Sequence, residues 1–268
     1  MPTLFPETDV ESIMSEGIAP PELVGVAVGV AILPRLSRAA RADNTAEGFR
    51  TMDEGIGLAM ALTLPAAAAL AIAPQFLLEG IFTRGAFLTS DARNAGTALF
   101  HYAWGVPAFV LIKVLAPAYF AHEDTKTPMK FALWSVLINI VFGAGLFFWL
   151  QSEGVYGFPG LAIATSLAAW VNVVLLSGRL IRLGWYRPGR VFLSRLCRSI
   201  IATAMMCVGL FFALEHREMI RAVSLDSKLY MTLVFILTGM VIYGAAAFLT
   251  GAVRLRDLKS LARRRAVE

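Results

Sequence analysis

The chain has 268 residues, of which 57% are hydrophobic and only 16% are charged, and its mean hydropathy is +0.67. A soluble domain averages about 45–50% apolar and about 25% charged residues. The composition therefore excludes a soluble enzyme, a collagen-like fibre and a disordered tail, and it requires a lipid bilayer. The net charge of +5 leaves nucleic-acid binding open until the basic residues are placed along the chain.

The N-terminal 22 residues differ from the rest of the chain. They carry five acids (Glu7, Asp9, Glu11, Glu16 and Glu22), no Lys or Arg and no continuous apolar core, so they do not form a signal peptide. The first apolar run, over 23–33, is too short to cross a hydrocarbon layer of about 30 Å at about 1.5 Å per residue. It therefore reads as the second half of a helix, and residues 1–22 as an extension.

A basic linker over 34–55 follows, and beyond it apolar runs of membrane-spanning length recur with short connections rich in Gly, Pro and charge. This spacing predicts an all-α polytopic membrane bundle, with six full spans and one short N-terminal span. The bundle should occupy 23–253, and a basic tail should occupy 254–268. The six runs lie at about 56–73, 95–121, 129–150, 159–178, 199–214 and 229–250.

The basic residues alternate with the spans. The connections over 34–55, 122–130 and 179–198, together with the tail over 254–268, hold 18 of the 24 Lys and Arg residues. The remaining connections hold five, and Lys113 lies inside a span. Cytoplasmic loops carry such an excess, so we expect the tail in the cytoplasm. The basic residues then serve topology and contact membrane lipids, and we expect no nucleic-acid partner.

Signals for catalysis are absent from the sequence. His101, His122 and His216 lie in three different segments without metal-ligand spacing, and no glycine-rich phosphate loop or Ser-His-Asp set is visible. Cys197 and Cys207 are about 15 Å apart if both lie on one helix, which is too far for a disulfide. The sequence thus predicts a transporter and no enzyme, with no cofactor and no metal site.

Cations near or inside the spans are candidates for a substrate path. Lys113 lies about 12 Å from the cytoplasmic end of its span, where a cation costs about 2.5–3.5 kcal/mol. It is either an anchor or internal ion-pair partner, or a contact for substrate. Arg35 and Arg38 follow the short span at helical spacing, where they either anchor lipid headgroups or recognise a phosphorylated lipid substrate.

Polar and helix-breaking residues at membrane depth form the second group of candidates. Asn139 and Asn172 either join helices by hydrogen bonds or contact a ligand. Pro65, Pro107 and Pro117 either bend during transport or fix a kink. The connection HEDTKTPMK is expected to be a well-capped helix start that contains Asp124, with Thr127 as the cap and Pro128 in the first turn.

Four segments, taken in order, resemble the MurJ (MviN) family of bacterial lipid II flippases: GVAVGVAILPRLSRAARAD, LPAAAALAIAPQFLLEGIFTRGAF, KVLAPAYFAHEDTKTPMK and GLAIATSLAAWVNVVLL. The resemblance covers roughly residues 23–250. It implies a relation to the MATE exporters and polysaccharide flippases, in which two helical lobes open alternately to each side of the inner membrane.

The resemblance also implies that much of such a protein is missing. A full-length member resembles fourteen spans, and this chain is similar to the second half of the eighth through the fourteenth. The eighth span normally begins with Ala-Asp-Arg-x-x-Glu, and its Asp, Arg and Glu fall here on Met14, Ser15 and Ile18. Residues 1–22 are therefore expected to be unrelated to the family.

By resemblance, the chain is the C-terminal part of a flippase that moves undecaprenyl-pyrophosphate-linked peptidoglycan precursor to the periplasmic face of the bacterial inner membrane, without covalent chemistry. Its expected partners are that lipid-linked precursor, membrane lipids and an N-terminal lobe absent from this chain. Two alternatives stay open. The chain is an inactive half-protein that needs a separate N-terminal lobe, or it exports another lipid-linked or drug substrate.

Overall fold

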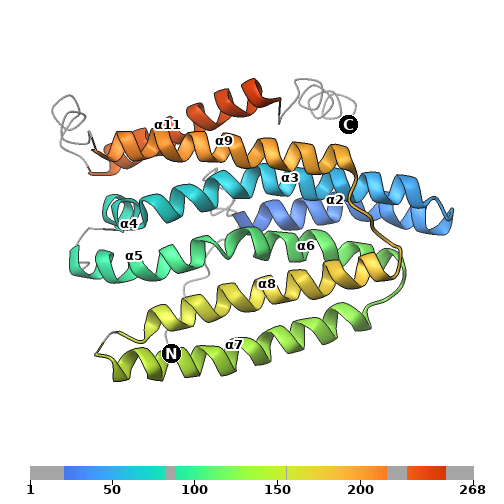
Figure 1. Ribbon diagram of the computed structural model, residues 1–268, viewed down its shortest axis with the longest axis horizontal. Helices are drawn as coiled ribbons and strands as arrows, with labels where there is room; N and C mark the ends of the chain where they lie inside the picture. Colours follow the sequence, from blue (N-terminus) through green and yellow to red (C-terminus); the bar gives the residue numbers. More distant parts are fainter. Residues whose placement is uncertain (1–20, 83–88, 155, 216–227, 252–268) are drawn as a thin grey trace, which may run out of the picture.

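The computed structural model describes residues 21–82, 89–154, 156–215 and 228–251. Most of the predicted extension over 1–22 and all of the predicted tail over 254–268 lie outside the described residues. The described chain forms a bundle of helices that run roughly along one common axis (Figure 1). The helices are α2 (Pro21–Arg41), α3 (Thr45–Ile72), α4 (Pro74–Phe82), α5 (Thr89–Ala103), α6 (Val106–Ala121), α7 (Lys126–Ser152), α8 (Phe158–Arg182), α9 (Arg190–Glu215) and α11 (Lys228–Thr250).

The bundle has the predicted membrane character. Five described helices, α3, α7, α8, α9 and α11, are long and apolar enough to cross a bilayer, and the bent pair of α5 and α6 makes a sixth candidate span. This confirms the predicted all-α polytopic bundle. The short N-terminal run becomes α2, which is not one of the candidate spans in the described chain.

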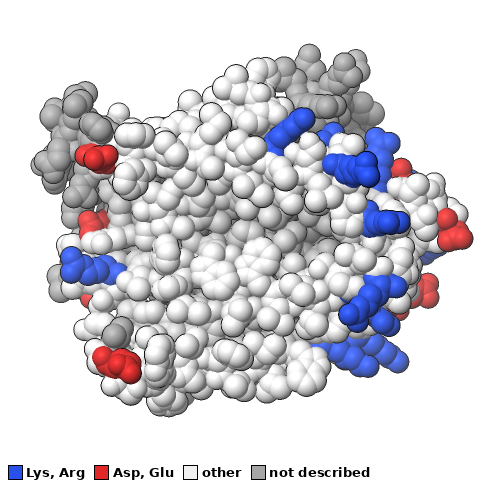
Figure 2. Space-filling model, viewed as in Figure 1, with Lys and Arg blue, Asp and Glu red and all other residues white. Residues whose placement is uncertain are grey.

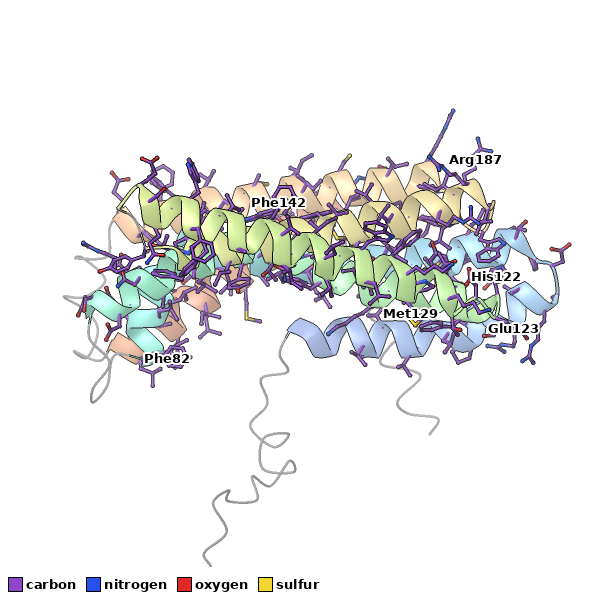
Figure 3. All side chains as sticks on the ribbon, turned by 90° about the horizontal axis from the view of Figure 1, so that it is seen from below. Phe82, His122, Glu123, Met129, Phe142 and Arg187 are labelled. Atoms are coloured by element: carbon purple, nitrogen blue, oxygen red, sulfur yellow. The ribbon has the colours of Figure 1, made fainter. Side chains whose placement is uncertain are left out.

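The outward surface of α7 shows why the bundle needs lipid. Gly143 is the one residue of this helix that is buried. Phe142, labelled in Figure 3, projects from the middle of α7 and is half exposed, as are Trp134 and Trp149. An apolar face of this size in water would drive association or aggregation. In a bilayer the same side chains face acyl chains, and the helix satisfies its own backbone groups.

Two larger apolar clusters and a small one between α9 and α11 hold the described bundle together. The largest joins α2, α3, α6 and α8 around fully buried residues such as Met52, Val114 and Leu180. The second joins α3, α4, α9 and α11, with Leu77, Leu210 and Phe235 at its centre. The helices α9 and α11 therefore pack beside α3 and α4 as a pair, on the side away from α7 (Figure 1).

The prediction of a linker over 34–55 was wrong. The helix α2 continues through Pro34 to Arg41, and α3 begins at Thr45, so only residues 42–44 connect them. Hydrophobicity marks where a segment enters the headgroup region, whereas a helix ends only where its backbone bonds end. The connection over 74–94 likewise contains a helix that was not predicted, α4, which begins at Pro74.

The predicted run over 95–121 is broken into α5 and α6, which are bent by 40°. The Gly105 N–H donates to the carbonyl of Tyr102, so the His101 carbonyl takes a donor from α8 instead, the Ser166 hydroxyl at 2.8 Å. The Trp170 indole N–H, one turn along α8, donates to the Trp104 carbonyl at 2.9 Å. Two side chains of α8 thus stabilise the break at membrane depth.

The kink at Pro65 in α3 is completed by the last described helix. Proline has no N–H, so it cannot donate to the carbonyl four residues earlier, that of Ala61. The Tyr243 hydroxyl of α11 donates to this carbonyl at 2.7 Å. A neighbouring helix therefore supplies the missing hydrogen bond, as membrane helices with internal prolines require.

The charges are distributed unequally between the two ends of the bundle. The basic connections α2–α3, α6–α7 and α8–α9 lie at one end, where α11 also ends, and Figure 2 shows a band of Lys and Arg side chains there. The opposite end shows mainly acidic side chains in this view. Figure 3 accordingly places His122, Glu123 and Arg187 together, far from Phe82. The fold thus gathers onto one end the three described connections that we expected in the cytoplasm.

We expect Tyr243→Phe to destabilise the chain by about 0.6 kcal/mol, the average for such interhelical bonds, because the Ala61 carbonyl loses its donor. Thermal unfolding of the purified chain in detergent measures the effect. Tyr230→Phe is the matched control, since Tyr230 lies on the same helix and is half exposed. Equal unfolding temperatures for the two variants would contradict the role given to Tyr243.

Candidate functional site

Lys113 lies on α6, where this helix packs against α2, and its side chain is partly buried. Its neighbours on α2 are Gly25 and Gly29, one turn apart. The lysine stem passes beside Gly25, and the lysine main chain lies against Gly29. We call this contact between α2 and α6 the glycine seam. It places the one cation of the predicted spans in a narrow interhelical contact.

Arg35 lies at the basic end, in the corner between α2 and α3. Its guanidinium pairs with Glu54 at 2.7 Å and with Glu47 at 3.0 Å. Arg50 pairs with the other oxygen of Glu54 at 3.1 Å. Two cations and two carboxylates therefore balance. The arrangement accounts for Arg35 as a residue that fastens α2 to α3.

Arg38 is exposed one turn later, and its Nε donates to the Pro34 carbonyl at 3.3 Å. It forms no ion pair with any described carboxylate. Of the two arginines proposed from the sequence, Arg38 is thus the one whose charge faces the surroundings of the protein. Arg38 is therefore accessible to an anionic headgroup at this end of the bundle.

Asn139 lies on α7 and Asn172 lies on α8, and Asn139 forms a hydrogen bond between these helices. The Oδ1 of Asn139 accepts a hydrogen bond from the Thr165 hydroxyl at 3.2 Å. Asn139 and Thr165 line an open groove of about 500 Å³ whose other walls are apolar, among them Gly143 and Leu161. Asn172 is buried on α8, and its Oδ1 has no hydrogen-bond partner in the described structure. The side chain of Asn139 on α7 is therefore hydrogen-bonded to Thr165 on α8.

The prolines occupy three different local settings. Pro107 starts α6 directly after the break, where its missing N–H costs no helical bond. Pro117 lies inside α6 and is buried, and it removes the donor that the Lys113 carbonyl would otherwise have four residues later. Pro65 forms the kink that Tyr243 completes. Each proline thus sits where neighbouring groups accommodate it.

The start of α7 differs from the prediction in its capping residue. We expected Thr127 to cap, but Thr127 lies inside the first turn and its N–H donates to Asp124 at 3.0 Å. Hydrogen bonds from the Thr127 hydroxyl and N–H hold the pKa of Asp124 below its usual value. Pro128 is the third residue of the helix, in the first turn as predicted. The prediction failed because either side chain is a suitable cap by type.

A hydrogen-bonded contact between α3 and the α8–α9 connection was not predicted from the sequence. The two carboxylate oxygens of Asp53 accept from the Tyr186 hydroxyl at 2.8 Å and from the Gly189 N–H at 3.2 Å. Burial, followed by the bond to Asp53, raises the pKa of Tyr186 well above its ordinary value. Trp185, next to it, stacks on His122 of the α6–α7 corner with ring centroids 4.0 Å apart. One connection thereby ties α3 and α6 at the basic end.

The structure therefore does not gather the predicted substrate-path residues at one point. Lys113 lies in the glycine seam, Arg35 and Arg38 lie at the basic end, Asn139 lies between α7 and α8, and Asn172 is buried on α8. No group of three or more His, Cys, Asp or Glu residues that could hold a metal ion occurs in the part of the chain that the structure describes. The most informative missed signal is Gly-Val-Ala-Val-Gly at 25–29, a spacing that lets membrane helices approach closely.

Comparisons with known proteins point to one family. A family profile described as "Lipid II flippase MurJ" matches residues 19–248. "Probable lipid II flippase MurJ" of Rhizobium meliloti (strain 1021) is 35% identical over 244 residues, which cover 90% of this chain and 44% of the relative. The protein of the same name from Vibrio cholerae serotype O1 is 36% identical over 243 residues, 89% of this chain and 44% of the relative.

A solved structure described as "Lipid II flippase MurJ, inward closed conformation" shares the fold, with a TM-score of 0.66 at 20% identity. The match covers 89% of this chain and 45% of that chain. This chain thus spans less than half the length of the relatives that it matches.

We expect Asp124→Ala to cost about 1 kcal/mol at neutral pH, as the loss of a helix cap does. The depressed pKa of Asp124 means that the carboxylate's contribution is complete above the pKa of the unfolded chain and is lost as the pH falls through that of the folded chain. Thermal unfolding in detergent across acid pH measures both effects. Asp124→Asn, which keeps an acceptor but no charge, should retain part of the cap and lose this pH dependence; an unchanged profile would contradict the assignment.

Proposed function

We propose, since this chain belongs to the lipid II flippase MurJ family, that it forms the C-terminal lobe of a lipid II flippase and supplies one wall of the path that lipid II crosses. The family makes the chain a multi-pass membrane transporter protein, not an enzyme. The proposed cargo is undecaprenyl-pyrophosphate-linked peptidoglycan precursor, moved from the cytoplasmic to the periplasmic face. The movement is a change of position and requires no bond to be made or broken.

The position of Lys113 supports a more specific proposal about how the chain contributes to transport. A cation at membrane depth is costly and typically faces a bundle interior or a water-filled path. The substrate named for this family carries a diphosphate, whose charge needs compensation while it crosses a layer of about 30 Å. A lysine held in the glycine seam supplies such compensation from α6. We propose Lys113 as the substrate contact and Arg38 as an entry contact at the basic end.

The orientation and the second wall complete the proposal. The excess of Lys and Arg at one end of the bundle supports placing that end in the cytoplasm, together with the C-terminus, in the bacterial inner membrane. A path between two lobes needs a second helical lobe. Because the chain covers 44% of its relatives, we propose a separate N-terminal lobe as its partner. The same coverage favours the alternative that the chain alone transports nothing.

Complementation of a flippase-depleted strain tests the function. We expect growth when the chain is expressed with the N-terminal lobe of a relative, and no growth with either piece alone. Growth with the chain alone would contradict the need for a second lobe. Failure of the pair, with both pieces present in the membrane, would contradict the flippase assignment and leave export of another lipid-linked or drug substrate to be tested.

The role of Lys113 has its own test in the complementing pair. Lys113→Met should abolish growth while the amount of protein in the membrane stays unchanged, because the path loses its cation. Lys130→Met is the matched control, since Lys130 is an exposed lysine on α7 near the basic end. Full growth with Lys113→Met would return Lys113 to the role of an anchor.

A further inference from the structure

The glycine seam is tighter than an ordinary helix contact. If position 29 carried a Cβ atom, that atom would lie 2.5 Å from the Lys113 carbonyl oxygen and 3.4 Å from Pro117 Cγ. The first distance is shorter than a real Cβ contact, and the obstructing atom belongs to backbone. A side chain at position 29 therefore requires α2 and α6 to move apart.

Position 25, one turn earlier, faces the lysine side chain. A Cβ atom there would lie 3.3 Å from Lys113 Cδ and 3.1 Å from Val110 Cγ1. These two atoms belong to side chains, which can give by a few tenths of an ångström, and the nearest backbone atom, Val110 Cα, lies 3.3 Å away, farther than the carbonyl oxygen that a Cβ at position 29 would meet. The two glycines thus differ: Gly29 sets the distance between the backbones, and Gly25 leaves a passage for the lysine stem.

Pro117 explains why the Lys113 carbonyl faces α2. In an α-helix this carbonyl would accept from the N–H of residue 117, which proline lacks. Without that donor the carbonyl can tilt away from the helix axis, and the close approach of Gly29 brings a Cα–H group against it, a weak but recurrent contact between membrane helices. Both residues therefore affect the Lys113 carbonyl oxygen: Pro117 removes its α-helical donor, and Gly29 allows α2 to contact it.

From this geometry we propose that Gly25 and Gly29 are positioning residues for Lys113: Gly29 receives its carbonyl, and Gly25 directs its stem along α2. The inference rests on the proposed function in one respect, the role of Lys113 in the path. The position of the lysine is then set by α2 as well as by its own helix, and a change in the α2–α6 distance changes where the ammonium group lies.

Chemical reactivity of Lys113 tests the proposal without transport. Membranes that contain the full chain are treated with a small amine-acylating ester, and the modification of each lysine is followed by mass spectrometry. In Gly25→Ala the stem is displaced from the seam, so the rate at Lys113 should rise several-fold while the rate at Lys130 stays constant. Gly145→Ala is the control, because a Cβ at position 145 meets nothing within 4 Å. An unchanged or lower rate at Lys113 in Gly25→Ala would overturn the role of Gly25.

The link between Gly29 and Pro117 is tested by a double-mutant cycle on the unfolding temperature in detergent. Gly29→Ala should lower it strongly, because a Cβ meets the Lys113 carbonyl. Pro117→Ala restores an N–H donor that draws the carbonyl back, so Gly29→Ala combined with Pro117→Ala should lose less than the sum of the single variants. Additive losses would overturn the link, and so would a Gly29→Ala variant as stable as Gly145→Ala.

The two proposals fail separately. If Lys113→Met supports full growth but Gly25→Ala accelerates acylation of Lys113, the positioning role of Gly25 is supported and the transport role of Lys113 is rejected. If Lys113→Met abolishes growth but Gly25→Ala leaves the acylation rate of Lys113 unchanged, the transport role of Lys113 is supported and the positioning role of Gly25 is rejected.

Discussion

The membrane gives backbone groups no water to bond, and this constraint governs where the helices of this chain meet. Each described break or kink inside the candidate spans lies beside groups of another helix. The carbonyls exposed at the α5–α6 break accept from Ser166 and Trp170 of α8, and the Ala61 carbonyl accepts from Tyr243 of α11. The carbonyl that Pro117 deprives of its α-helical donor lies against Gly29 of α2. Apolar side chains fill the interior of the bundle, whereas the contacts to these backbone carbonyls determine which helix faces lie against each other.

At the basic end, charged side chains pair with one another. There Arg35 and Arg50 share Glu47 and Glu54, and Asp53 holds the α8–α9 connection, so several of the charged groups act within the protein. Such exposed ion pairs contribute little to stability individually. Lys113, by contrast, is partly buried within the bundle, in the contact between α2 and α6.

The sequence predicts the parts of this structure that depend on composition and local order. Hydrophobic runs locate the spans, and the clustering of basic residues correctly groups the connections at one end. Partnerships between distant residues are not readable in this way. Pro65 is visible as a kink, but nothing near it indicates Tyr243, whose hydroxyl reaches a carbonyl 182 positions earlier. The same holds for Asp53 and Tyr186, 133 positions apart. Even the choice of Asp124 over Thr127 as cap depends on the residue at which α7 begins, which residue type alone does not determine.

The bond between Tyr243 and Ala61 also has a consequence for how the protein is made. The ribosome produces Ala61 long before Tyr243, so α3 enters the bilayer with a proline kink whose carbonyl has no donor yet. Until α11 is inserted, that carbonyl must be served by water, by the insertion machinery or by a temporary neighbour. The Ala61 carbonyl of α3 therefore gains this donor only after α11 is in place. A chain that ended before Tyr243 would leave the Ala61 carbonyl, near the beginning of the bundle, without this donor.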